Sequence, residues 1–251
     1  MNRFFLPTDC ISAGEVHFPE NSSHQISQVL RLRTGQEIIV LDNSGFEYTV
    51  EIDQVSAHAV SGKITAKQPS LAEPAARISL YLGLTQREKF EWMLQKCTEA
   101  GAAAFVPVIS SRCLVQTEQD VSNKLERWKR IICEAAEQSG RGLIPTLSPA
   151  VKFEEALQSA AQHALVLFPW EKEKSLSLHQ ALRAYLQGSS PSTDWKVAIF
   201  IGPEGGYSDQ EAGLARRAGS VPVTMGKRIL RMETAALVAT ALTLSEFGDM
   251  G

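Results

Sequence analysis

The pattern of hydrophobic and polar residues divides the chain into two parts. In residues 1–70, the stretch "EIIVLDNSGFEYTVEIDQV" contains an apolar run, a turn at 43–45 and a second run rich in Tyr, Val and Ile. This order is typical of a β-hairpin, and "AVSGKITAKQP" continues it. Upstream, Ile26, Val29 and Leu30 recur at helical spacing and predict a short helix. We therefore expect a small, β-rich module that closes into a compact barrel.

The remainder, residues 71–251, alternates short apolar runs with amphipathic segments. The runs "ISLYLGL", "AFVPVI", "ALVLF", "KVAIFI" and "SVPVTM" predict strands, and "QGSSPSTD" predicts a surface loop. Nearly continuous apolar strands that alternate with helices indicate a mostly parallel α/β sheet. The predicted helices span residues 87–101, 123–138, 178–186, 209–218 and 234–247.

Length and composition place the chain among ordinary globular proteins. Its 251 residues suit one large or two smaller domains, and 44% apolar with 21% charged residues is typical of such proteins. The apolar run before Pro7 is too short for a signal segment, and the Ala/Thr-rich stretch 235–244 is shorter than a membrane span. We therefore expect a cytoplasmic protein with no membrane partner.

Cysteine spacing argues against a disulfide-bonded or metal-binding protein, and net charge argues against a generally basic nucleic-acid-binding protein. The four cysteines form no C-x-x-C pair and have no closely spaced histidines, so we expect reduced thiols and no metal site. The net charge of −3 gives no general basic field, and residues 1–70 hold five Lys/Arg against eight Asp/Glu. Any RNA binding must therefore use local basic clusters.

The stretch "AIFIGPEGGYSDQE" ends a predicted strand in a glycine-rich turn at 202–206, followed by a capping box that opens a helix. Ligands of open α/β sheets bind at such strand ends. The spacing fits neither the phosphate-binding loop nor the dinucleotide fingerprint, and Glu204 would repel a phosphate. This pattern favours a ligand that is neutral or cationic beside Glu204. A tight turn without any ligand is the alternative.

A second loop, "VTMGKRILRMETAALVA", places Gly226 at another strand end and follows it with three cations. We expect Thr234 to cap the next helix, and Glu233 to interact with the positive end of that helix. Arginines here can hold an RNA phosphate or a pyrimidine carbonyl through forked hydrogen bonds. A solvated charged loop is the alternative. Both loops follow neighbouring elements of the pattern, so we expect them to face one crevice.

Taken together, these two loops resemble the SPOUT-class RNA methyltransferases, and most closely the bacterial 16S ribosomal RNA (uracil-N3)-methyltransferase family. The similarity extends over the whole chain: "NRFF" with "HQISQVLRLRTGQEI" looks like the family's amino-terminal module, and "KFEWMLQKCTEAGAAAFVPVISSRC" and "EAAEQSGR" resemble intermediate motifs. The resemblance implies a PUA-like β-barrel RNA-binding domain at 1–70. It further implies an α/β SPOUT domain at 71–251, with a parallel sheet tied in a trefoil knot.

The resemblance also implies a function. A relative of this family would use S-adenosylmethionine to methylate N3 of a specific uridine in 16S ribosomal RNA, within the small ribosomal subunit, as a homodimer. The alternatives are another SPOUT RNA methyltransferase, acting on a ribose 2′-hydroxyl or a different base, and a noncatalytic RNA-binding factor in ribosome assembly. For the dimer, the helix at 234–247 is the candidate interface, although a helix that faces the core would show the same pattern.

Site residues follow from the same resemblance. Arg231 and Arg228 are expected to stabilise a uracil anion. Glu233 is a candidate proton acceptor, although stabilisation of the helix start is its favoured role. The expected RNA contacts are Arg3, Arg31, Arg33 and Arg141. The expected cofactor-binding residues are Ile201, Gly202, Pro203, Glu204, Gly205, Gly206, Met225, Gly226, Ile229, Leu230 and Thr234.

Overall fold

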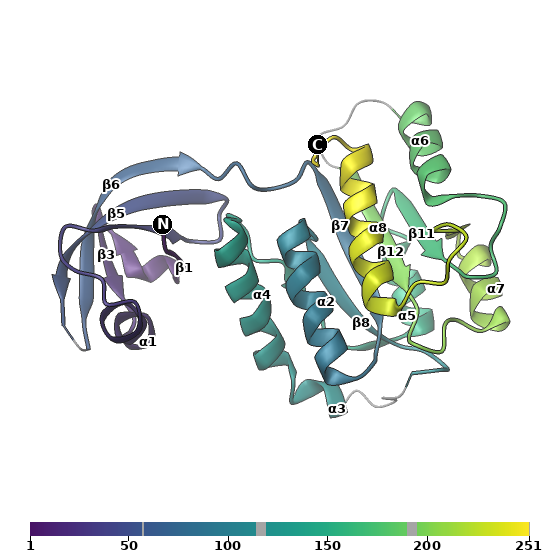
Figure 1. The fold of residues 1–251 in the computed structure, drawn as a ribbon, viewed down its shortest axis with the longest axis horizontal. Helices are drawn as coiled ribbons and strands as arrows, with labels where there is room; N and C mark the ends of the chain where they lie inside the picture. The colour runs from purple at the N-terminus through teal and green to yellow at the C-terminus, as the bar shows by residue number, and fades with distance from the viewer. Residues whose placement is uncertain (57, 114–118, 190–194, 251) are drawn as a thin grey trace. The chain divides into compact units, whose positions relative to one another are not determined.

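The computed structural model describes residues 1–56, 58–113, 119–189 and 195–250, which form two compact units (Figure 1). Unit 1 contains Met1–Glu73 and Ala136–Ile144, and unit 2 contains Pro74–Ala135 and Pro145–Gly251. Within the described ranges, no helix combines the length and the apolar character needed to cross a bilayer. Most of the predicted surface loop "QGSSPSTD" lies outside the described residues.

Unit 1 is built on a six-stranded sheet in the order β1-β4-β5-β6-β3-β2. β1 pairs with β4 in parallel and the other neighbours are antiparallel, so the hairpin predicted around residues 43–45 is present as β4 and β5. Alternate residues, among them Ile38, Val50 and Ile52, point into one buried core. The strands are β1 (Arg3–Phe5), β2 (Ile11–Ser12), β3 (Glu15–Phe18), β4 (Glu37–Leu41), β5 (Phe46–Val55) and β6 (Val60–Pro69).

The short helix of unit 1 differs from its prediction in one respect. A 3-10 turn, η1 (Thr8–Cys10), precedes α1 (Glu20–His24), which continues as a π-helix, η2 (Gln25–Val29). Ile26 is fully buried as expected, but Val29 is 66% exposed. The prediction for Val29 is wrong because a π-turn advances fewer degrees per residue than an α-turn, so a three-residue spacing does not return to the same face.

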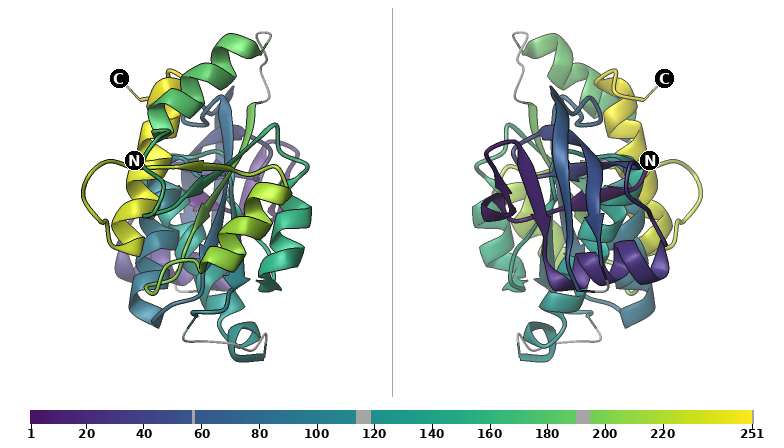
Figure 2. Two further views of the ribbon diagram at one scale, coloured as in Figure 1. Left: turned by 90° about the vertical axis from the view of Figure 1, so that its right-hand side faces the viewer. Right: turned by 90° about the vertical axis from the view of Figure 1, so that its left-hand side faces the viewer.

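Unit 2 contains a parallel sheet in the order β10-β8-β7-β12-β11-β13, with β9 beside β8. α2, α6 and α8 cover one face and α5 and α7 the other (Figure 2). The strands are β7 (Ala76–Gly83), β8 (Ala104–Ile109), β9 (Thr146–Leu147), β10 (Val151–Lys152), β11 (Leu165–Pro169), β12 (Trp195–Ile201) and β13 (Val221–Val223). The helices are α2 (Arg87–Ala100), α3 (Gln119–Ser122), α4 (Leu125–Ser139), α5 (Phe153–Ala160), α6 (Leu178–Gly188), α7 (Asp209–Arg217) and α8 (Met232–Glu246), and the last residues of α4, from Ala136 on, belong to unit 1.

Aromatic side chains from adjacent strands fill the core of unit 2. Tyr81 of β7 stacks on Phe200 of β12 with ring centroids 4.5 Å apart, and Phe168 of β11 stacks on Tyr207 at 4.6 Å. This packing fixes the strands beside one another. Because all of them are parallel, their carboxyl ends meet at one edge, and the loops that follow them gather there.

Candidate functional site

The first glycine loop follows β12 and forms a tight turn. The Gly206 N–H donates to the Pro203 carbonyl at 2.8 Å, and Gly206 has a φ of +63°, a conformation that favours glycine. A Cβ added to Gly202 would lie 3.1 Å from the Tyr207 ring. The turn geometry favours glycine at 206, and close packing against Tyr207 favours glycine at 202.

Glu211 fixes the start of α7 after this loop. Its carboxylate accepts the Ser208 N–H at 2.8 Å while Ser208 Oγ accepts the Glu211 N–H, which completes the predicted capping box. The Ser111 N–H also donates to it at 2.8 Å. Burial alone would raise the pKa of Glu211, but these hydrogen bonds hold its pKa below the ordinary value. The carboxylate is therefore charged although it is buried.

The second glycine loop joins β13 to α8. Gly226 has a φ of +112° and donates its N–H to Thr224 Oγ1 at 3.3 Å. The prediction that Thr234 caps α8 is wrong: the helix begins at Met232, and Arg231 occupies the N-cap position without a side-chain hydrogen bond. Glu233 lies in the first turn, where the helix dipole favours a negative charge, as expected.

A third loop, after β11, was missed by the sequence reasoning. Its Trp170 N–H donates to the Val223 carbonyl at 3.0 Å, and Lys174 Nζ donates to the Glu171 carbonyl at 2.6 Å. β11 lies between β12 and β13 in the sheet, so this loop follows the strand between the two glycine loops. The available signal was "PWEKEK" at the end of a strand that the sequence did predict.

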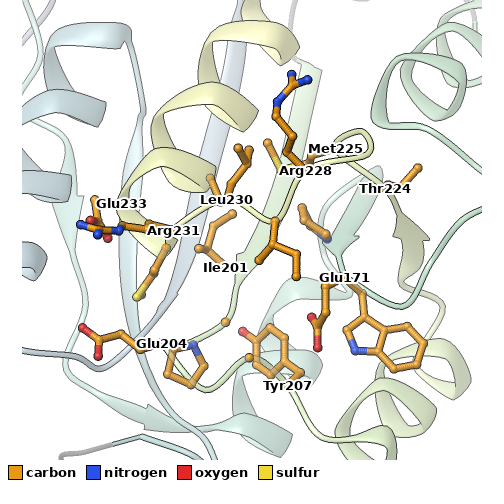
Figure 3. Close-up of a pocket in the computed structure, with 18 of the residues that line it drawn as sticks. Glu171, Ile201, Glu204, Tyr207, Thr224, Met225, Arg228, Leu230, Arg231 and Glu233 are labelled. Atoms are coloured by element: carbon orange, nitrogen blue, oxygen red, sulfur yellow. The ribbon is translucent and has the colours of Figure 1, made fainter.

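These three loops enclose a cavity of about 640 Å³ (Figure 3). Cavities of this size accommodate small-molecule ligands and cofactors. Every expected cofactor residue except Thr234, which is exposed, lines the cavity, as do Arg228, Arg231 and Glu233. The lining residues that were not predicted are Lys89, Pro169, Trp170, Glu171, Lys174, Tyr207, Thr224, Lys227, Met232 and Ala235.

Glu204 is held by side chains that follow β7. Lys89 Nζ donates to Glu204 Oε1 and forms an ion pair with it, and Thr85 Oγ1 donates to the same oxygen at 3.2 Å. The hydrogen bond from Lys89 lowers the pKa of Glu204, and the charge of Arg231 acts in the same direction. Glu204 is therefore an ionised and already partnered carboxylate at the cavity wall.

Two further contacts hold the loop at 202–206 in place. Arg112 Nη1 donates to the Gly205 carbonyl at 2.8 Å, and a Cβ added to Gly205 would lie 3.2 Å from the Arg112 Cβ. At the end of β7, a Cβ added to Gly83 would lie only 2.6 Å from the Pro203 nitrogen. The backbone of this loop is therefore packed tightly against its neighbours.

The expected RNA-contacting arginines of unit 1 differ in their surroundings. Arg31 and Arg33 are exposed, and their guanidinium groups have no recorded polar partner among the described residues. Arg3 is partly buried and pairs with Glu47 at 2.7 Å. Two of the three are therefore open to a phosphate, and the third is neutralised within the unit.

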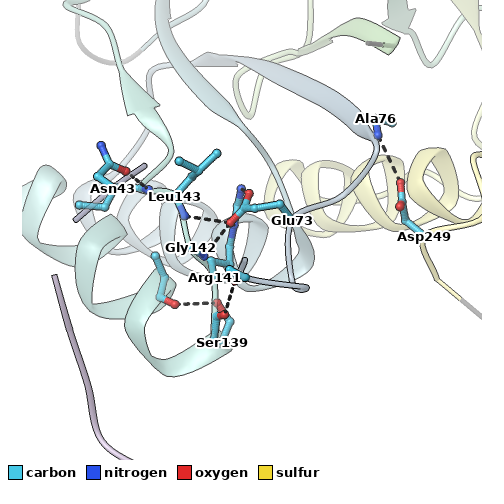
Figure 4. Close-up of polar contacts among 12 residues, drawn as sticks. Asn43, Glu73, Ala76, Ser139, Arg141, Gly142, Leu143 and Asp249 are labelled. Carbon is cyan, nitrogen blue, oxygen red and sulfur yellow. Dashed lines mark hydrogen bonds and ion pairs between the residues drawn. The ribbon is translucent and has the colours of Figure 1, made fainter. Parts of the chain in front are cut away.

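Arg141 occupies a different environment from the one expected. Its guanidinium Nη2 lies 2.8 Å from Glu73, whose carboxylate also accepts the N–H groups of Gly142 and Leu143 (Figure 4). Arg141 is 3% exposed. The guanidinium is therefore buried against this carboxylate, and its charge is compensated within unit 1.

Comparison with known proteins identifies the family. A family model of the RNA methyltransferase domain matches residues 72–244, and a model of the RNA methyltransferase PUA domain matches residues 23–65. The chain belongs to the RNA methyltransferase family. Its relatives include ribosomal RNA small subunit methyltransferase E of Synechocystis, 36% identical over 87% of this chain and 69% of the relative, and that of Bacillus subtilis, 33% identical over 95% and 94%.

Solved structures extend the similarity to the whole fold. Ribosomal RNA small subunit methyltransferase E of Neisseria gonorrhoeae, solved bound to S-adenosyl methionine, is 30% identical and has a TM-score of 0.84, covering 98% of this chain and 97% of its own. The expected fold class is confirmed: this RNA methyltransferase has a SPOUT-class parallel-sheet domain preceded by a PUA-like β module.

Proposed function

We propose that this chain is an S-adenosylmethionine-dependent methyltransferase that modifies N3 of a uridine in the 16S ribosomal RNA of the small ribosomal subunit. The observation that carries the proposal is the cavity of about 640 Å³ enclosed by the three strand-end loops, two of which contain glycine at the strand end. The names of its relatives, and the S-adenosyl methionine bound to the Neisseria gonorrhoeae protein, support the same function.

The cavity wall fits this cofactor in shape and charge. A Cβ at Gly202 or Gly205 would make a tight contact of 3.1 Å with Tyr207 or 3.2 Å with Arg112, so close packing favours glycine here and backbone forms the wall at these positions. When bound, the cofactor supplies a methyl group carried on a positively charged sulfur, a charge that the Glu204 carboxylate accommodates. The residues that would hold it are Ile201, Gly202, Pro203, Glu204, Gly205, Gly206, Met225, Gly226, Ile229 and Leu230.

The chain's own residues then have to prepare the acceptor. Uracil N3 bears a proton, so a base or a stabilised anion is required before nitrogen can attack carbon. Arg231 and Arg228 both line the cavity and can stabilise negative charge on the uracil carbonyl oxygens. Glu233 lines the same wall and is our candidate for the proton acceptor. The enclosing loops align the reacting atoms and exclude water.

RNA binding and catalysis are assigned to different parts of the chain. We assign RNA binding to the PUA-like domain at 1–70, with phosphate contacts from Arg31 and Arg33, and catalysis to residues 71–251. Because Glu47 neutralises its charge, Arg3 contributes less to phosphate binding than Arg31 and Arg33. We further propose a cytoplasmic homodimer that pairs through α8, on which Leu242 is 46% exposed.

Mapping ribosomal RNA by mass spectrometry in a strain that lacks this protein tests substrate and chemistry together. The expected result is the loss of one 3-methyluridine from 16S RNA, restored by the wild-type gene. Loss of a ribose 2′-O-methyl group instead would assign the chain to a different methyltransferase activity. Intact modification, with RNA binding but no S-adenosylmethionine binding by calorimetry, would identify a noncatalytic assembly factor.

A further inference from the structure

An ion pair at the cavity edge joins two residues far apart in the sequence. Lys89 lies in the first turn of α2, and Glu204 lies in the loop after β12. Their side chains are 34% and 37% exposed, whereas Thr85, which donates to the same Glu204 oxygen at 3.2 Å, is buried. Because both side chains are this exposed to water, the ion pair contributes only about 0–1 kcal/mol to stability. Stabilising the fold is therefore a small part of what this pair does.

Glu204 has a second potential partner across the same part of the cavity. Figure 3 shows Glu204, Arg231 and Glu233 on one side of the pocket, and the charge of Arg231 already contributes to lowering the pKa of Glu204. Arg231 is exposed, and its guanidinium has no recorded hydrogen bond or ion pair in the part of the chain that the structure describes. A guanidinium binds a free carboxylate through two parallel hydrogen bonds. Glu204 is therefore a competing partner for the Arg231 guanidinium if no other group holds its carboxylate.

The geometry points to Lys89: we propose that it is a positioning residue that holds Glu204 at the start of α2 and so leaves the Arg231 guanidinium free to face the RNA base. Thr85 assists by donating to the same carboxylate oxygen. This inference rests on the proposed methyltransferase function and on the role of Arg231 in it. It assigns Lys89 no contact with the RNA and none with the reacting atoms.

Replacing Lys89 by methionine tests the inference, because it keeps the length of the side chain and removes its charge. Glu204 is then expected to pair with Arg231, and kcat for RNA methylation to fall by about tenfold, a fraction of the loss expected when such a donor is removed outright. The Tm is expected to stay close to the wild-type value. Lys89→Arg should recover most of the activity lost in Lys89→Met.

The deciding variant is the double one, Lys89→Met with Glu204→Gln. A neutral amide no longer captures Arg231 as an ion pair, so the double variant should turn over as fast as Glu204→Gln alone. Lys96→Met is the matched control, since Lys96 lies on the same helix, pairs with Glu99 at 2.8 Å and does not line the cavity. It is expected to have wild-type kinetics.

Three results would overturn the positioning role. Unchanged kcat in Lys89→Met would show that Arg231 needs no protection from Glu204. A defect that Glu204→Gln does not relieve would show that Lys89 acts directly, for example on RNA phosphate. A joint fall in Tm and cofactor affinity would identify a structural role. If the wild-type protein transfers no methyl group in the same assay, the proposed function itself fails, and the positioning role fails with it.

Discussion

The substitution Gly83→Ala tests whether the cofactor wall depends on how closely β7 packs against the loop after β12. A Cβ at this position would lie 2.6 Å from the Pro203 nitrogen and 3.1 Å from the Gly202 carbonyl carbon. Comfortable contacts between such atoms are about 3.4 Å or longer, so one side has to move by about 0.8 Å. The atoms in the way belong to backbone and to a proline ring, which cannot rotate aside.

The size of the effect follows from this displacement. Overpacking a tight contact costs about 1–3 kcal/mol, which lowers the Tm of a chain of this size by about 2–12 °C. The loop that moves carries Gly202 to Gly206, which line the proposed cofactor site. Because a displacement of about 1 Å in a reacting assembly can cost about 100-fold in rate, we expect both cofactor affinity and turnover to fall by at least about tenfold.

Titration calorimetry with S-adenosylmethionine and a thermal melt measure the two effects separately. Gly62→Ala is the matched control: its Cβ would lie 2.6 Å from the Glu51 carbonyl oxygen, an equal clash in unit 1 and outside the cavity. It should lower the Tm and leave cofactor affinity unchanged. Gly213→Ala, which meets only the end of the Arg217 side chain at 3.5 Å, should bind normally. Wild-type affinity in Gly83→Ala, or equal weakening in Gly62→Ala, would refute the reasoning.

Three further predictions concern charged groups. Arg231→Ala should lower single-turnover methylation by about 100–1000-fold at unchanged Tm; near wild-type turnover would remove Arg231 from the catalytic assignment. Glu73→Ala should destabilise unit 1 by about 3 kcal/mol, because it leaves the buried Arg141 without its carboxylate; hydrogen exchange of the β4 and β5 amides should speed up accordingly, and unchanged exchange would contradict this. The depressed pKa of Glu211 means that its stabilising effect is complete above the ordinary value of 4.5 and is lost as pH falls through its folded value. The Tm advantage of wild type over Glu211→Gln should therefore shrink as pH falls from 6 towards 3, and a constant advantage would show that the charge of Glu211 is not involved.

The elements of the fold were largely predictable because their signals are local. Gly101 ends α2 with a φ of +111°, and Ser208 with Glu211 opens α7 through a capping box, both as the sequence indicated. Strand limits were less accurate: β13 covers only Val221–Val223 of the predicted "SVPVTM". The start of α8 was misplaced because a favourable capping residue, Thr234, stands three residues past the actual N-cap, where it has no capping role.

The site was predictable only in part, because it depends on the order of strands in the sheet. Two glycine loops are visible as motifs, but nothing local indicates that β11 lies between β12 and β13 and brings Trp170 and Glu171 to the same cavity. Ion pairs between residues distant in the sequence could not be predicted for the same reason. Lys89 and Glu204 are separated by 115 positions, and Arg141 and Glu73 by 68. Such pairs are set by tertiary structure, so no spacing rule finds them.

The proposed binding of RNA by an acidic chain depends on which of its cations are already paired with carboxylates. Arg3 and Arg141 are neutralised by Glu47 and Glu73, so they add little to the field outside unit 1. By contrast, the cations of the loop after β13, which carries Arg231, are exposed and have no recorded polar partner in the described ranges. We expect these unpaired charges to attract a phosphate or an anionic base to a cavity whose lining also includes Glu171, Glu204 and Glu233. RNA affinity should therefore depend more steeply on this loop than the net charge of −3 implies.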